Sequence, residues 1–247
     1  MRRPASVYGS SLSSFGPGPI STALKALIAA NVVMFVVIAF APGLRDYLGL
    51  VPTLVLQHLW AWQLATYMFL HAGIFHILFN MLALWMFGAE LERIWGTRYF
   101  LKFYFVTGIG AGALTVLFSL LPFAFAQQVQ GSVIVGASGA IYGLLLAYAM
   151  YFPDRPILLL VFWVPAKWCV AILGAIALLS SLSDAGGVAN ATHVGGLLIG
   201  YLMLKGARMH PWSEVKYRYL KWKINRVRKK FDVYSGGRAN DYDRRVH

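Results

Sequence analysis

Long stretches without a charged residue constrain this chain more than any other feature. Ala26–Leu44, Tyr47–Ala89 and Phe103–Pro153 contain no Lys, Arg, Asp or Glu. A helix needs about 20 predominantly apolar residues to cross the ~30 Å hydrocarbon layer of a bilayer. Charged residues make up only 13% of the chain and hydrophobic residues 59%, against about 25% and about 45–50% in soluble domains. The sequence therefore predicts a polytopic helical membrane protein and excludes an ordinary soluble enzyme or a disordered chain.

Polar and turn-forming residues divide these runs into shorter apolar segments. The resulting pattern predicts an all-α fold with six transmembrane helices. The first predicted span is Ala26–Leu44, and the others lie near residues 71–93, 99–121, 137–152, 168–183 and 191–205. Residues 47–70 are expected to form an external segment that dips into the membrane interface. Pro156–Ala166 is too short to span a bilayer, so we expect it to be an interfacial connection.

The basic residues predict the orientation of the spans. The formal net charge is +13, and 13 of the 22 Lys and Arg residues lie between Lys205 and His247. If the N-terminus is cytoplasmic, only Arg45 lies in an external loop. The cytoplasmic side then holds this tail together with Arg2, Arg3, Lys25, Arg93, Arg98, Lys102, Arg155 and Lys167. The positive-inside rule thus predicts that both termini are cytoplasmic.

Three parts of the chain are expected from this pattern. Residues 1–20 form a flexible cytoplasmic N-terminus without the features of a signal peptide, residues 21–209 form the six-span domain, and residues 210–247 form a basic tail. The tail interleaves basic and aromatic residues from Trp212 to Phe231, which is typical of a helix lying on an anionic leaflet. We therefore expect a partly helical, then disordered tail that contacts anionic lipids and no nucleic acid.

Polar residues gather near the outer ends of three predicted spans. His71, His76 and Asn80 begin the second span, Ser138 begins the fourth and His193 begins the sixth. Because alternate spans run in opposite directions, all five should lie at a similar depth on the external side. Polar groups inside a membrane are costly, so such a cluster predicts a functional site.

Ser138 lies in the segment Gly136-Ala137-Ser138-Gly139, at the predicted start of a helix. The free backbone N–H groups of a first helical turn favour negative charge, and small neighbours would let a peptide carbonyl approach the hydroxyl. A serine in this position is more often a simple N-cap. Ser138 alone therefore does not establish nucleophilic catalysis.

His193 supplies the possible partner. It shares a helix face with Gly196 and Gly200. Gly139, Gly143 and Ala147 form a matching stripe of small residues in the fourth span. Packing of the two stripes would bring His193 beside Ser138, where an imidazole can act as a general base. Tyr142 lies four residues after Ser138, on the same face, and could stack against the imidazole.

His76 and Asn80 are four residues apart, so their side chains project from one face of a helix. Neutral donors aimed at one point suit an oxyanion hole, to which the backbone N–H of Ser138 could also contribute. Either residue alone could equally form a simple hydrogen bond between helices.

Metal and aspartyl chemistry fit the pattern less well. On one helix, His71 and His76 would be separated by about 140°, which is not the arrangement of a zinc protease. Glu90 and Glu92 lie at the predicted cytoplasmic end, where they are expected to pair with Arg93 and neighbouring basic groups. No metal and no other cofactor is therefore expected.

Together these motifs resemble the rhomboid family of intramembrane serine proteases. The matching segments are His76–Asn80, Gly136–Gly139 with Tyr142, and Thr192–Gly196 with Gly200, and the resemblance covers about residues 20–210. It implies a catalytic dyad of Ser138 and His193 without a third acid. It further implies an oxyanion site from His76, Asn80 and the Ser138 amide, and stacking of Tyr142 on His193. We expect Gly136, Gly139 and His71 to support the site. The expected substrates are transmembrane proteins, cleaved near the outer membrane face.

The chain departs from the family pattern at Trp62-Gln63, where many members have Trp-Arg. This departure puts in doubt a shared hydrogen-bond network in the external loop, but not the dyad. The six-span form is usual in bacteria, which implies a multi-pass protein of the bacterial cytoplasmic (inner) membrane.

Two other classes of protein remain as alternatives. A catalytically inactive rhomboid-like protein that binds membrane clients would keep the spans and glycines but lose Ser138 or His193. A small transporter would place ionisable groups along a path across the membrane and show repeat symmetry. Both Ser138 and His193 are present and the polar groups cluster on one side, which favours the protease.

Overall fold

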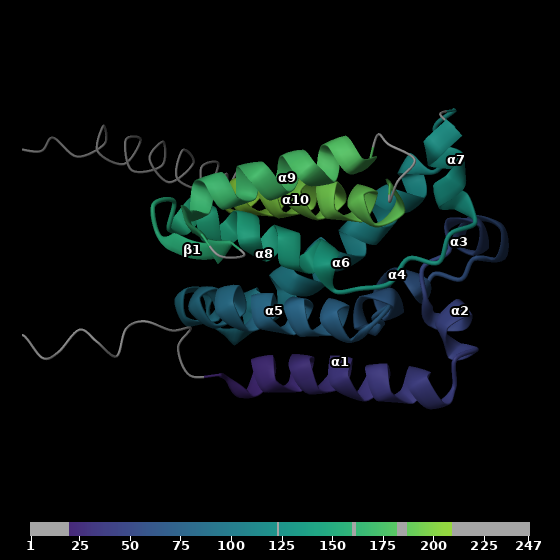
Figure 1. Ribbon diagram of the computed structural model, residues 1–247, viewed down its shortest axis with the longest axis horizontal. Coiled ribbons are helices and arrows are strands. Elements are labelled where there is room, and N and C mark those ends of the chain that lie inside the picture. The colour runs from purple at the N-terminus through teal and green to yellow at the C-terminus, as the bar shows by residue number, and fades with distance from the viewer. Residues whose placement is uncertain (1–19, 123, 160–161, 182–186, 209–247) are drawn as a thin grey trace, which may run out of the picture. The chain divides into compact units, whose positions relative to one another are not determined.

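The computed structural model describes residues 20–122, 124–159, 162–181 and 187–208 (Figure 1). The chain divides into two units, Met1–Leu204 and Lys205–His247, and the site lies within the first. The predicted basic tail 210–247, and all but the last residue of the predicted N-terminal segment 1–20, lie outside the described residues.

Each predicted span has a corresponding helix. These helices are α1 (Thr22–Phe40), α5 (Ile74–Trp95), α6 (Thr97–Phe118), α8 (Ser138–Tyr151), α9 (Ala166–Ser181) and α10 (Gly187–Arg208). By length and composition α1, α5 and α6 could each cross a membrane, whereas α8 and α9 are apolar but shorter. The fold is therefore mostly helical, and the number of spans and their orientation stay predictions.

Three helix boundaries differ from the predicted ones. Lys25 lies inside α1, because the helix begins at Thr22 and is capped by Ser21, whose hydroxyl accepts a hydrogen bond from the Leu24 N–H at 3.0 Å. His71 precedes α5, which begins only after the extended Gly73. His193 lies in the second turn of α10, since that helix begins at Gly187. A charged residue can lie within an apolar helix when its long side chain reaches water, so the ends of a charge-free run need not coincide with the ends of the helix.

Short helices form the connections at the end of the bundle that carries the predicted site. They are α2 (Leu44–Leu48), α3 (Pro52–His58), α4 (Gln63–Thr66), the 3-10 turn η2 (Tyr67–Phe69) and α7 (Ala124–Gln130). Figure 1 shows α2, α3, α4 and α7 gathered at one end of the long helices. Leu50 and Ile134 exchange two backbone hydrogen bonds of 2.9 Å. These bonds tie the segment 47–70 to the loop that precedes α8.

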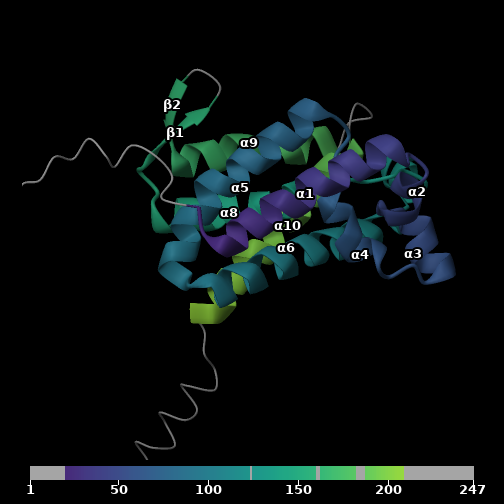
Figure 2. The ribbon, with the colours of Figure 1, turned by 90° about the horizontal axis from the view of Figure 1, so that it is seen from below.

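The expected all-α fold is wrong at one connection. The strands β1 (Pro156–Leu159) and β2 (Phe162–Pro165) pair antiparallel, with Pro156 opposite Pro165. Figure 2 shows this hairpin beside the start of α9. The β-branched and aromatic residues of this segment favour strands, and one backbone hydrogen bond, from the Ala166 N–H to the Arg155 carbonyl at 2.9 Å, lies just beyond the paired prolines. The interfacial location of this connection stays a prediction.

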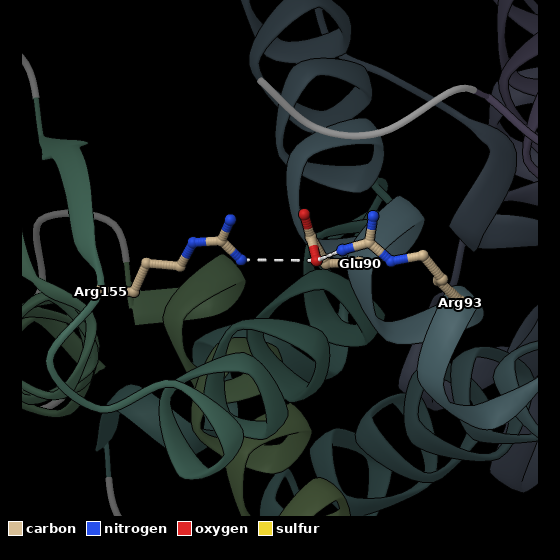
Figure 3. Close-up of polar contacts among 3 residues, drawn as sticks. All are labelled: Glu90, Arg93 and Arg155. Atoms are coloured by element: carbon tan, nitrogen blue, oxygen red, sulfur yellow. Dashed lines mark hydrogen bonds and ion pairs between the residues drawn. The ribbon is translucent and has the colours of Figure 1, made fainter. Parts of the chain in front are cut away.

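The other end of α5 carries a buried carboxylate, Glu90, which is only 4% exposed. Figure 3 shows its carboxylate between the guanidinium groups of Arg93 and Arg155. The contact with Arg93 was predicted, whereas Arg155, whose nitrogen lies 3.4 Å from Glu90, comes from the connection that follows α8. Glu90 therefore joins α5 to the segment that leads into the hairpin.

Glu92 does not pair with Arg93 as predicted. Its two carboxylate oxygens accept hydrogen bonds from the hydroxyls of Ser21, at 2.5 Å, and Thr97, at 2.7 Å. Ser21 caps α1 and Thr97 begins α6. Glu92 thus holds the starts of two helices against the end of α5.

Candidate functional site

The helices α8 and α10 cross in direct backbone contact at two pairs of glycines. A Cβ atom added to Gly196 would lie 2.0 Å from the carbonyl oxygen of Gly139. One added to Gly200 would lie 3.0 Å from the Cα of Gly143. No side chain fits between the two helices at these points, which is the arrangement that the spacing of small residues predicts.

This close approach brings His193 and Ser138 together. The Nε2 atom of His193 lies 2.8 Å from the Oγ atom of Ser138. Ser138 is the first residue of α8, and the preceding Ala137 occupies the N-cap position. The hydroxyl therefore makes no capping hydrogen bond and is free to interact with the imidazole.

Tyr142 stacks on the imidazole of His193. The two ring centroids are 4.2 Å apart and the planes differ by only 7°. Within the described residues, Nδ1 of His193 has no hydrogen-bond partner. Ring stacking and helix packing therefore orient the imidazole, since no carboxylate in the described part of the chain contacts it.

The hydrogen bonds of His76 define its tautomer. The backbone N–H of Ala72 donates to Nδ1 of His76 at 3.2 Å, so the hydrogen of the neutral ring is on Nε2. This Nε2 lies 3.0 Å from the position that a Cβ atom at Gly136 would take, and the Ser138 hydroxyl lies 3.5 Å from the same position. Gly136 also has a φ of +129°, which other residues rarely adopt. A glycine here leaves a space bordered by an N–H donor and a nucleophilic hydroxyl.

Asn80 and His71 lie near this space but contact Ser138 less directly. The Asn80 amide donates one hydrogen bond to the His76 carbonyl at 2.8 Å, which leaves its second N–H for another acceptor. The His71 ring packs edge-on against His76, with centroids 5.1 Å apart. Among the described residues, no three His, Cys, Asp or Glu side chains gather as a metal site would require.

Tyr67 supports the loop that carries Ser138, and the sequence did not single it out. Its carbonyl accepts a hydrogen bond of 2.9 Å from the Gly136 N–H, and its hydroxyl donates to the Gly108 carbonyl of α6 at 2.7 Å. Tyr67 is fully buried. A tyrosine in an external loop gives no sequence signal for this role, because its partners are backbone groups far away in the chain.

Gln63, the residue that departs from the family pattern, organises the segment 47–70 through its side-chain amide. Its Oε1 accepts a hydrogen bond from the Val51 N–H at 3.0 Å. Its Nε2 donates to the carbonyls of Asp46, at 3.3 Å, and Tyr47, at 3.2 Å. An arginine could donate but could not accept. This chain therefore has a loop network of its own, built on a neutral side chain.

Taken together, these groups can perform acyl-transfer chemistry. A serine hydroxyl that is hydrogen-bonded to a neutral imidazole can be deprotonated as it attacks a carbonyl carbon. The N–H of His76 and the first-turn amides of α8 border the place where negative charge would develop.

Comparison with known proteins identifies the family. Residues 58–208 match the Rhomboid domain. The chain is 31% identical over 186 residues to the Rhomboid protease GluP of Bacillus subtilis, covering 70% of this chain and 32% of that protein. It is 37% identical over 141 residues to Rhomboid protein 1, mitochondrial, of Saccharomyces cerevisiae, covering 54% of this chain and 38% of that protein. It is 28% identical over 196 residues to Rhomboid-like protein 19 of Arabidopsis thaliana, covering 78% of this chain and 63% of that protein.

The alignments thus span between about one third and two thirds of the length of these relatives. The matched region contains Asn80, Ser138 and His193, so it includes the whole of the site described above. This chain belongs to the rhomboid family of integral membrane proteins.

Proposed function

We propose that this protein is an intramembrane serine endopeptidase that cleaves transmembrane substrate proteins near the outer membrane face. The observation that carries the proposal is the 2.8 Å contact between Nε2 of His193 and Oγ of Ser138. Stacking of Tyr142 on the imidazole supports it, because a base without a carboxylate partner needs another means of orientation.

The proposed reaction proceeds through an acyl-enzyme. Ser138 Oγ attacks the scissile carbonyl carbon while its proton moves to Nε2 of His193. The carbon–nitrogen bond then breaks, and the amine leaves with that proton. A water molecule, deprotonated by the same Nε2, attacks the ester. The bond from carbon to Oγ breaks, Ser138 recovers the proton and the carboxylate product departs.

The oxyanion formed in each step requires donors. We assign this role to Nε2–H of His76, the backbone N–H of Ser138 and the second amide hydrogen of Asn80. The first of these is supported by the tautomer that the Ala72 contact fixes. Donors that are already oriented stabilise developing charge without reorganising, and loss of one donor elsewhere has cost roughly 10²–10³ in kcat.

The proposed topology has six spans, both termini in the cytoplasm and the cytoplasmic membrane of a bacterium as its location. It rests on the distribution of Lys and Arg and on the family resemblance. Reporter fusions at residue 45 and after residue 247 test it, since the proposal requires the two positions to lie on opposite sides of the membrane.

Labelling with a fluorophosphonate probe tests the chemistry directly. The purified protein, with its modified residue mapped by mass spectrometry, should label at Ser138 and not after Ser138→Ala. Ser132→Ala is the matched control, since Ser132 lies in the preceding loop and its hydroxyl donates to the Gln128 carbonyl at 2.7 Å. Absence of labelling at Ser138 together with capture of an intact transmembrane client would favour the inactive, client-binding alternative.

A further inference from the structure

A stripe of small and hydroxyl-bearing residues on α6 packs against the crossing of α8 and α10. Thr107, Ala111 and Thr115 repeat every four residues and therefore share one face of the helix. A Cβ atom at Gly139 would lie 3.0 Å from the Cβ of Ala111, and one at Gly195 would lie 3.1 Å from the carbonyl oxygen of Ala111. The α6 helix thus touches both catalytic helices beside the proposed dyad.

One turn beyond Ala111, Thr115 of α6 meets Thr192 of α10, and their hydroxyls form a chain of hydrogen bonds with a defined direction. Oγ1 of Thr115 lies 2.8 Å from the Ala111 carbonyl oxygen and 2.9 Å from Oγ1 of Thr192. A hydroxyl has only one hydrogen, and a carbonyl oxygen can only accept. Thr115 must therefore donate to Ala111, and Thr192 must donate to Thr115.

Both hydroxyls are out of reach of solvent, since Thr115 is 0% and Thr192 is 2% exposed. Thr192 is also the residue immediately before His193, and its methyl group would lie 3.1 Å from a Cβ atom at Gly139. The pair therefore links α6, α8 and α10 at one level, next to the Ser138–His193 contact.

We propose that Thr115 and Thr192 are positioning residues that fix the register of α10 and so keep Nε2 of His193 within reach of Ser138. This inference rests on the proposed function. Within the described residues Nδ1 of His193 has no partner, so the place of the imidazole depends on the place of its helix. A slide or rotation of α10 would break a buried hydrogen bond that no water can replace.

The direction of the chain makes the two threonines unequal. In Thr192→Val, Thr115 still donates to the Ala111 carbonyl, so no polar group is left without a partner. In Thr115→Val, the Thr192 hydroxyl loses its acceptor in a buried place. It can regain one only by turning towards the preceding turn of its own helix. Thr115→Val should therefore disturb α10 more than Thr192→Val.

The test measures kcat and KM on a transmembrane substrate, the rate of fluorophosphonate labelling at Ser138, and the thermal unfolding temperature of each full-length variant. We expect Thr115→Val to lower kcat and labelling about tenfold or more, and Thr192→Val about threefold, with KM within about twofold in both. Thr115→Ser, which keeps the hydroxyl, should restore most of the loss.

Thr107→Val is the matched control. Thr107 lies on the same face of α6, is equally buried and faces Met203 of α10, but its hydroxyl makes only a long contact of 3.9 Å to the methionine sulfur. It lies about two helical turns from Thr115 along α6. This variant should keep kcat and labelling within about twofold of the unaltered protein.

Five results would decide whether the two threonines act as proposed. The order unaltered protein, Thr107→Val, Thr192→Val, Thr115→Val, from fastest to slowest, supports the inference. The inference is wrong if Thr115→Val labels as fast as Thr107→Val. It is also wrong if Thr115→Ser loses as much of the labelling rate as Thr115→Val. If Thr115→Val does not fold, equal rates for Thr192→Val and Thr107→Val overturn it. If the unaltered protein itself fails to label, the proposed function has failed and this inference falls with it.

Discussion

The two ends of α5 use polar side chains in opposite ways. At its first turns, His76 and Asn80 are neutral, bond mainly to backbone groups of their own helix and turn, and keep donors unused. At its last turns, Glu90 and Glu92 are buried carboxylates. Glu90 pairs with Arg93 and Arg155, and Glu92 accepts hydrogen bonds from Ser21 and Thr97.

The difference separates chemistry from stability along a single helix. A buried carboxylate that is paired with basic groups or hydroxyls of other elements holds those elements together. A group with a spare donor costs stability when it is buried, yet it is ready to bind developing charge. Changes at the first end should therefore reduce rate, and changes at the second end should reduce stability.

The largest effect is expected from the dyad itself. Ser138→Ala and His193→Ala should each lower cleavage of a transmembrane substrate by at least about a thousandfold, with the unfolding temperature nearly unchanged. The double variant should be no slower than either single one, because the two residues act as a unit. Substantial cleavage by Ser138→Ala, measured by gel assay, would reject nucleophilic catalysis at this residue.

Asn80→Ala should lower kcat roughly ten- to a thousandfold and change KM less, because the missing donor acts mainly in the transition state. Asn31→Ala is a close control. Asn31 is buried in α1, and its amide also donates to the carbonyl four residues earlier, Leu27, at 2.8 Å. If both variants lose activity and stability in parallel, the amide of Asn80 is only structural.

Replacing the stacked ring should separate packing from hydrogen bonding. Tyr142→Phe keeps the surface that contacts His193, so it should retain most of the cleavage rate. Tyr142→Ala removes that surface, and the misoriented imidazole should lower kcat by about ten- to a hundredfold. Equal and severe losses in the two variants, measured on one substrate, would mean that the hydroxyl matters and the ring does not.

Gln63→Arg introduces the family's more frequent residue and should destabilise this chain. The arginine cannot accept the Val51 N–H, and it places a charge where Gln63 is fully buried. We expect a loss of about 1–3 kcal/mol in the free energy of unfolding. Gln63→Glu keeps the acceptor for Val51 but loses the donors to Asp46 and Tyr47, so both variants should be compared by thermal unfolding. An unchanged unfolding temperature for Gln63→Arg would show that the loop rearranges freely.

At the far end of α5, Glu90→Gln should lower stability without lowering the rate of Ser138 labelling. We expect a loss of about 1–2 kcal/mol, because both arginines partly reach solvent and can be hydrated when the charge is removed. Asp154→Asn is the control, since its ion pair with Lys167 is largely exposed and should contribute little. A slower labelling rate in folded Glu90→Gln would mean that the two ends of α5 are coupled.

Local sequence was enough to predict the helices and the candidate dyad. Hydrophobic runs separated by charges predicted a helix for each span, because burial of apolar side chains depends on composition over one or two dozen residues. The repeats of Gly139 with Gly143 and of Gly196 with Gly200 predicted which faces meet, since small residues at spacing four allow close helix contact. Ser138 and His193 followed from those faces.

Only the tertiary structure decided how these residues are held. The tautomer of His76, the network of Gln63, the role of Tyr67 and the bond from Thr192 to Thr115 each depend on a backbone or hydroxyl group elsewhere in the chain. Hydrogen bonds act over about 3 Å and require a particular orientation, so sequence distance gives no measure of them. The hydrophobic pattern thus determined that helices form and which faces pack, while the geometry of the packed helices determined which polar atoms meet.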